Sequence, residues 1–119
     1  MRKRNVRGRT VHQAARLSKA RLDVLVADAT VDAYNEAEQA AGFFTMIEDH
    51  LELPFDTEIF GTKVTVGRVD MADDDSIVAV CRRGRERLRV PILEIPLPRP
   101  LPAGAEWIVA YRYWLTGRR

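Results

Sequence analysis

Carboxylate side chains dominate the middle of this sequence. Between Leu22 and Thr62 there are ten Asp and Glu residues and no Lys or Arg. A solvated helix face normally mixes both signs of charge, so this stretch of one sign favours a positively charged ligand. Carboxylate oxygens are the donors that hard cations such as Ca²⁺ prefer, and about six to eight oxygens complete a calcium site.

The candidate metal ligands fall into three groups. Asp32 and Glu36 are one helical turn apart, so they can point at a common ion. A second group follows at the end of the same predicted helix, and a third forms a polar loop between predicted strands. This loop is no EF-hand, because the alternating ligands, the central Gly and the distal Glu are missing. The full set of candidate ligands is Asp32, Glu36, Glu48, Asp49, Glu52, Asp70, Asp73, Asp74 and Asp75.

A simpler interpretation of these carboxylates stays open. Acidic residues on a helix most often form a solvated face, and Asp is common in turns because its side chain bonds to the nearby backbone. Since no single element carries enough ligands, any metal site must be assembled from two or more elements.

Catalytic chemistry finds little support in the sequence. His12 lies in a basic segment, and His50 lies at a predicted helix end, where a favourable interaction with the helix dipole is its simplest role. The lone Cys81 lies in a predicted strand and is expected to be a core thiol. The sequence has no zinc-ligand pair, phosphate loop or Gly-x-Ser-x-Gly motif. We therefore predict a protein without enzymatic activity.

Nucleic-acid binding is the alternative function, because arginines gather in two places and seek phosphates. The aromatic residues lie elsewhere, the acidic middle would repel a phosphate backbone, and the arginines could instead pair with the protein's own carboxylates. A third possibility is an adaptor that binds a protein through its proline-rich segment. The two basic groups are Arg2, Lys3, Arg4, Arg7 and Arg9 at the N-terminus, and Arg82, Arg83, Arg85, Arg87 and Arg89 in a predicted hairpin.

Helices are expected to position most of the acidic residues. Residues 1–9 read as a disordered basic arm, and residues 10–119 as a single domain. Apolar spacing predicts one helix from an N-cap at Thr10 to about Asp28 and a second from near Asp32 to about His50. Gly42 weakens the second helix but allows close approach of another backbone. Pro54 ends the helical region, which spans 10–52.

Strands follow the helices and complete an α+β fold. Alternating apolar residues predict strands at 57–60, 63–70, 77–82 and 88–93, the last two joined across Gly84. Short strands with tight turns suggest a small SH3-like or OB-like antiparallel β-barrel over 55–95, and we favour the SH3-like form. A proline-rich strap and a terminal helix near 104–115 occupy residues 96–116. No apolar run is long enough to span a membrane, and the cytoplasm is the expected location.

Residues 23–115 resemble the small bacterial calcium-binding proteins first known from cyanobacteria. The most specific segments are DAYNEAEQ at 32–39, IEDHLELPF at 47–55 and AEWIVAYRYW at 105–114. The resemblance implies a non-enzymatic calcium binder in which helices precede a small β-barrel. The predicted function is therefore an intracellular calcium buffer or sensor, with Ca²⁺ as its ligand.

Overall fold

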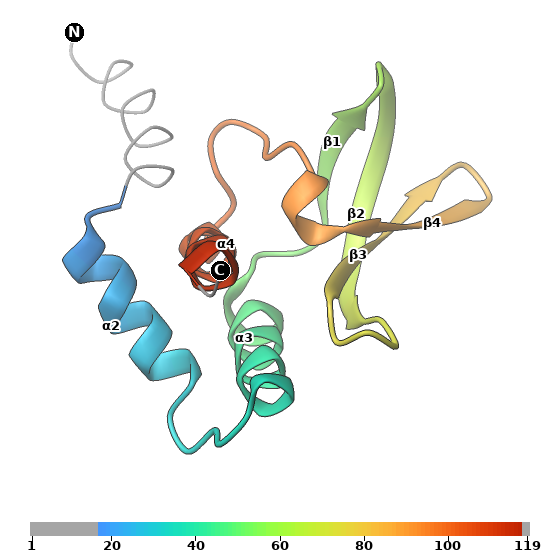
Figure 1. The fold of residues 1–119 in the computed structure, drawn as a ribbon. Helices are drawn as coiled ribbons and strands as arrows, with labels where there is room; N and C mark the ends of the chain where they lie inside the picture. Colours follow the sequence, from blue (N-terminus) through green and yellow to red (C-terminus); the bar gives the residue numbers. More distant parts are fainter. Residues whose placement is uncertain (1–16, 118–119) are drawn as a thin grey trace, which may run out of the picture.

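The computed structural model describes residues 17–117, in which three helices stand beside a four-stranded sheet (Figure 1). The α+β class is confirmed. The predicted basic arm and the predicted N-cap at Thr10 lie outside the described residues. The elements are α2 (Lys19–Ala29), α3 (Glu36–His50), β1 (Phe55–Ile59), β2 (Thr62–Met71), β3 (Ile77–Arg83), β4 (Glu86–Pro91), the 3₁₀ turn η1 (Ile92–Glu94) and α4 (Ala105–Gly117).

Polar caps fix where α2 and α3 begin. Ser18 is extended, and its hydroxyl accepts a hydrogen bond of 3.0 Å from the N–H of Arg21. The prediction of a continuous helix from Thr10 is therefore wrong at 17–18, because Ser18 caps a helix that begins at Lys19. At the start of α3, the Asn35 side chain accepts from the N–H of Glu38 at 2.8 Å. The Glu38 carboxylate in turn accepts from the N–H of Tyr34 at 2.6 Å, so α3 starts later than predicted.

A glycine lets α2 and α3 meet. A Cβ atom added to Gly42 would lie 1.9 Å from the carbonyl oxygen of Ala29, at the end of α2. The expected close approach at Gly42 is confirmed, and α2 supplies the approaching backbone. The exposed loop that follows α2 turns the chain back, and Asp32 in this loop has a φ of 63°.

The sheet is an antiparallel meander in the order β1-β2-β3-β4. Its inner face packs against the helices, and Phe43 and Ile47 of α3 are completely buried in the shared core. A bulge between Val66 and Arg68 shifts the register of β2 against β3. The buried inner-face residues are Val64, Val66, Val69, Ile77, Ala79 and Cys81.

The predicted closed barrel is not found within residues 17–117, because the sheet is open and β1 does not pair with β4. The chain after β4 does return to β1, where the Thr57 hydroxyl donates to the carbonyl oxygen of Pro96 at 2.5 Å. Four prolines in this strap lack the N–H groups that a further strand would need. The strap is therefore joined to β1 by this side-chain hydrogen bond, and not by the backbone hydrogen bonds that would close a barrel. The prolines are Pro96, Pro98, Pro100 and Pro102.

The terminal helix is confirmed as α4, and it closes the helical layer. Gly104 precedes it with a φ of +87° and lies against the end of α3, where an added Cβ would lie 2.2 Å from the carbonyl oxygen of His50. The α4 side chain of Tyr113 donates to Asp23 of α2 at 2.8 Å. None of the helices in the described part of the chain is long and apolar enough to cross a membrane.

Candidate metal site

A surface hollow of about 210 Å³ lies between the first turn of α3, the β2–β3 loop and α4. Glu36 and the loop residues Asp74 and Asp75, all predicted ligands, line it together with Ser76. Ala37 and Ala40 leave space on the α3 side because their side chains are small. The structure thus brings a helix-borne candidate and two loop candidates to one place.

The loop at 72–76 is organised by its own backbone and by Asp74. The N–H of Ala72 donates to the Ser76 carbonyl at 2.8 Å, and the N–H of Asp75 donates to the Ala72 carbonyl at 3.0 Å. Asp74 Oδ1 accepts from the Ser76 hydroxyl at 2.7 Å and from its N–H at 3.0 Å. These two hydrogen bonds hold the pKa of the Asp74 carboxyl below its ordinary value. Asp74 therefore stays ionised at neutral pH.

Aromatic residues of α4 line the hollow. The Tyr111 hydroxyl accepts from the N–H of Ile77 at 3.3 Å, which ties α4 to the strand that follows the loop. Burial raises the pKa of Tyr111, and the nearby Asp74 carboxylate raises it further. The Trp114 indole N–H donates to Gln39 of α3 at 3.1 Å. Both aromatic side chains pack in or against the hydrophobic core, and both also line the hollow.

The donor set of the hollow suits a hard cation. Three carboxylates and a hydroxyl supply only oxygen, which favours calcium or magnesium over zinc. Among residues 17–117, however, no three His, Cys, Asp or Glu side chains lie close enough together to hold an ion as they stand. An ion would therefore have to draw the exposed loop toward Glu36, which the flexible coordination geometry of Ca²⁺ tolerates better than Mg²⁺ does.

Asp32 lies outside this arrangement. It was predicted to share a helix face with Glu36, but α3 begins at Glu36 and Asp32 lies in the preceding turn. The helical spacing assumed for this pair is wrong, because Asn35 caps the helix after Asp32. Its role as a ligand stays a prediction.

The acidic residues at the other end of α3 cannot reach the hollow. Glu48 lies in the last turn of α3, about 18 Å along the axis from Glu36 at the usual rise per residue, and Asp49 follows it. Glu52 fastens the chain after α3 to the strap: its N–H donates to the Ala103 carbonyl at 2.8 Å, and its carboxylate accepts from the Ala103 N–H at 3.3 Å. These three residues are therefore separate from the hollow.

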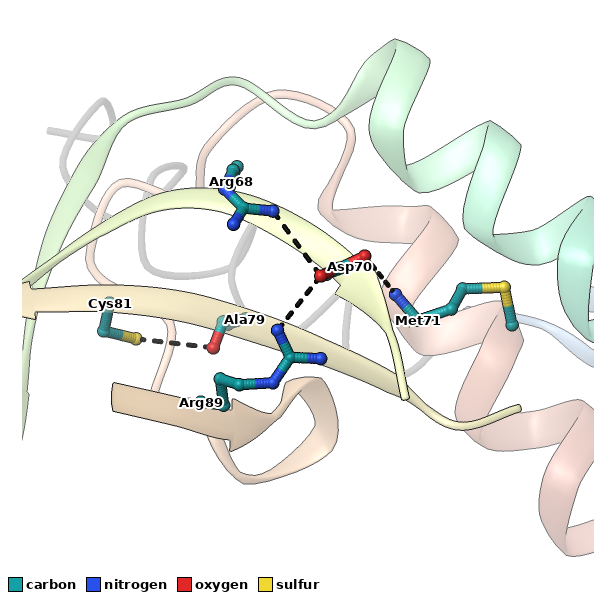
Figure 2. Close-up of polar contacts among 6 residues, drawn as sticks. All are labelled: Arg68, Asp70, Met71, Ala79, Cys81 and Arg89. Atoms are coloured by element: carbon teal, nitrogen blue, oxygen red, sulfur yellow. Dashed lines mark hydrogen bonds and ion pairs between the residues drawn. The ribbon is translucent and has the colours of Figure 1, made fainter. Parts of the chain in front are cut away.

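Asp70 is held by arginines of its own sheet (Figure 2). Its Oδ2 accepts from Arg89 at 3.0 Å and lies 3.6 Å from Arg68, and its Oδ1 accepts from the N–H of Met71 at 2.9 Å. These contacts argue against Asp70 as a ligand. Asp73 is exposed in the 72–76 loop but does not line the hollow.

The contacts of Asp70 predict an acid-dependent loss of stability. The hydrogen bond from Arg89, followed by that from Met71, lowers the pKa of Asp70 below its ordinary value of 3.8. A lowered pKa contributes stability that is present above about pH 3.8 and is lost as the pH falls further. We expect Asp70→Asn to reduce the melting temperature at pH 7 and to have a smaller effect at pH 2.5, as measured by thermal melts across this range. A constant difference at every pH would contradict this.

Two other expectations concern Cys81 and His50. Cys81 is buried and free, and burial raises its pKa, so the predicted core thiol is confirmed. Figure 2 shows its sulfur facing the Ala79 carbonyl, 3.9 Å away. His50 lies in the last turn of α3 and stacks on Trp107 with 5.7 Å between ring centres. Both residues have structural contacts that account for their positions.

The described residues define a small α+β protein with a surface hollow that offers carboxylate and hydroxyl oxygens as ligands. A family model described as calcium binding (Calci_bind_CcbP) matches residues 23–115, so the chain belongs to this calcium-binding family. The resemblance seen in the sequence is confirmed, and Ca²⁺ is the ion that the family description names. No curated protein and no solved structure matches the chain.

Proposed function

We propose that this protein binds Ca²⁺, without catalysis, in the hollow between the start of α3 and the β2–β3 loop. The observation that carries the proposal is that Glu36, Asp74 and Asp75 line one hollow although they come from distant parts of the sequence. Membership of a calcium-binding family supports the choice of ion. Asp74 supplies an ionised carboxylate, and Glu36 and Asp75 add the charge that a divalent cation requires.

The fixed strands on both sides of the loop favour a buffer over a sensor. Met71 and Ile77 pair at the base of the loop, and the Tyr111 hydroxyl holds the Ile77 N–H. An ion can therefore pull residues 72–76 toward α3 while the strands on both sides stay fixed. A sensor needs a larger rearrangement that exposes a new surface, whereas a buffer needs only this local closure.

Isothermal titration of metal-stripped protein with Ca²⁺, repeated against Mg²⁺ near physiological salt, tests the proposal. We expect Glu36→Gln combined with Asp75→Asn to weaken binding at least about tenfold, because charged ligands are lost. The matched control is Glu48→Gln with Asp49→Asn, which removes the same charge from the other end of α3. This control is expected to change the affinity by less than about threefold, because only a weak, salt-screened interaction between the removed charges and the ion is lost.

Tryptophan fluorescence adds a local readout. Trp114 lines the hollow, whereas Trp107 is buried against His50, so Ca²⁺ should change the Trp114 emission. The absence of any heat or thermal shift with Ca²⁺ would refute calcium binding. Equal losses of calcium affinity in the two double variants would instead refute the hollow as the binding site.

A further inference from the structure

The outer face of the sheet carries two arginines that face each other. Arg82 of β3 and Arg87 of β4 are directly opposite in the register, and both are exposed. Like charges at directly opposite positions destabilise a sheet. The sheet therefore tolerates a repulsion that a bound anion would relieve.

Neighbouring arginines are neutralised, but this pair is not. Arg68 and Arg89 share Asp70, and Arg83 pairs with Glu86. The expectation that the hairpin arginines pair with the protein's own carboxylates is thus confirmed for Arg83 and Arg89. No acidic side chain among residues 17–117 forms an ion pair with Arg82 or Arg87.

A second hollow of about 200 Å³ lies beside this pair, lined by Gly67, Arg68, Val80, Arg82 and Arg87. The bulge at Gly67 leaves this position without a side chain, so an anion can approach the backbone. Val80, only 7% exposed, contributes an apolar part of the lining. Low polarity beside a charged group strengthens its attraction for an ion of opposite sign.

Acidic residues limit the basic area on both sides. Asp70 occupies one side, between Arg68 and Arg89 (Figure 2). On the other side, Asp56 pairs in register with Thr65, which in turn pairs with Arg82. Since opposite residues of antiparallel strands share a face, the carboxylate of Asp56 lies on the same face as the two arginines. An extended polyanion would cross these carboxylates, whereas a compact one would not.

We propose that the hollow lined by Arg68, Arg82 and Arg87 binds a compact phosphate-type anion. Guanidinium groups form two parallel hydrogen bonds with phosphate oxygens, and opposed arginines can grip one group from two sides. Inorganic phosphate, pyrophosphate and the terminal phosphates of a nucleotide share this chemistry. The site lies on the opposite face of the sheet from the core and is independent of the proposed calcium site.

Pyrophosphate is the first ligand to titrate. Its binding to the full chain is monitored by nuclear magnetic resonance at constant ionic strength. We expect saturable shifts at Gly67, Val80 and the backbone of Arg82 and Arg87. Arg82→Gln and Arg87→Gln should each weaken binding at least tenfold. Both variants should also raise the melting temperature of the ligand-free protein, because they remove the repulsion. The control, Arg85→Gln, removes the same charge from the hairpin turn outside the hollow and should change affinity less than threefold.

Several results would overturn the proposal. Shifts that chloride reproduces at the same ionic strength would reflect general screening. An equal loss in Arg85→Gln would show a diffuse field in place of a site. A single-stranded oligonucleotide that binds more tightly than pyrophosphate and is not displaced by it would assign the surface to nucleic acid. Inorganic phosphate and a nucleoside diphosphate, titrated in parallel, distinguish the free anion from a nucleotide as the better ligand.

Discussion

Replacing Gly42 with Ala is expected to destabilise the protein by about 3 kcal/mol. The added Cβ would lie 1.9 Å from the carbonyl oxygen and 3.1 Å from the carbonyl carbon of Ala29. Both are backbone atoms, so no side chain can rotate to make room and α2 must move away from α3. Alanine alone would favour a helix interior by about 1 kcal/mol over glycine, and the clash outweighs this gain.

Gly117→Ala is the matched control for this substitution. Gly117 is the last residue of α4, and an added Cβ would meet nothing within 4 Å. This variant should be neutral or more stable by up to about 1 kcal/mol. Urea denaturation of both variants measures the difference. If Gly42→Ala unfolds at the same urea concentration as the parent chain, the helices are not packed as closely as described.

Phe43→Ala is expected to cost about 3–5 kcal/mol, a large part of the roughly 5–15 kcal/mol that stabilises a typical domain. Phe43 is completely buried. Its ring lies 5.2 Å from that of Trp114 and 5.8 Å from that of Tyr111, measured between centroids. Removing it leaves a cavity beneath the two aromatic residues that line the acidic hollow. Calcium affinity should therefore fall along with stability, even though Phe43 lies outside the ligand set.

Phe60 is a phenylalanine like Phe43, but it is exposed and not buried. Its side chain is fully exposed, and its φ of 51° is strained for a bulky residue. Phe60→Asn should leave the protein equally stable or stabilise it by about 1 kcal/mol, since Asn adopts this conformation more readily. Thermal melts of the two variants give the comparison. A similar loss of stability in both would mean that burial does not decide the effect.

Local sequence signals predicted much of the fold. The end of α3, the four strands, the strap and α4 each follow from periodicity or from a glycine or proline at a decisive position. The start of α3 could also have been found, because Asn35 followed by Glu38 is a recognisable capping pattern. The prediction of a closed barrel was wrong. Closure depends on how the prolines of the strap contact β1, and the pattern of apolar residues in the strands does not predict that contact.

The candidate site was predictable only in part. Glu36, Asp74 and Asp75 were identified as oxygen donors, but their meeting at one hollow depends on how α3, α4 and the β2–β3 loop come together in the fold. Asp70 looked equivalent to its acidic neighbours in the sequence. Its capture by Arg68 and Arg89 follows from strand register, which brings residues of β2 and β4 together across β3. Contacts of this kind between distant residues cannot be predicted from local sequence patterns.

The contact between Tyr113 and Asp23 has a consequence for how the protein is made. These residues are 90 positions apart, and α4 is also the helix that contacts Gln39 and the strand beginning at Ile77. During synthesis α2, α3 and the sheet are made before α4, so they cannot complete their packing until α4 has followed them. Contacts of such long range slow folding. The acidic hollow gains its two aromatic lining residues only when α4 docks, so it forms after the helices and strands that precede α4.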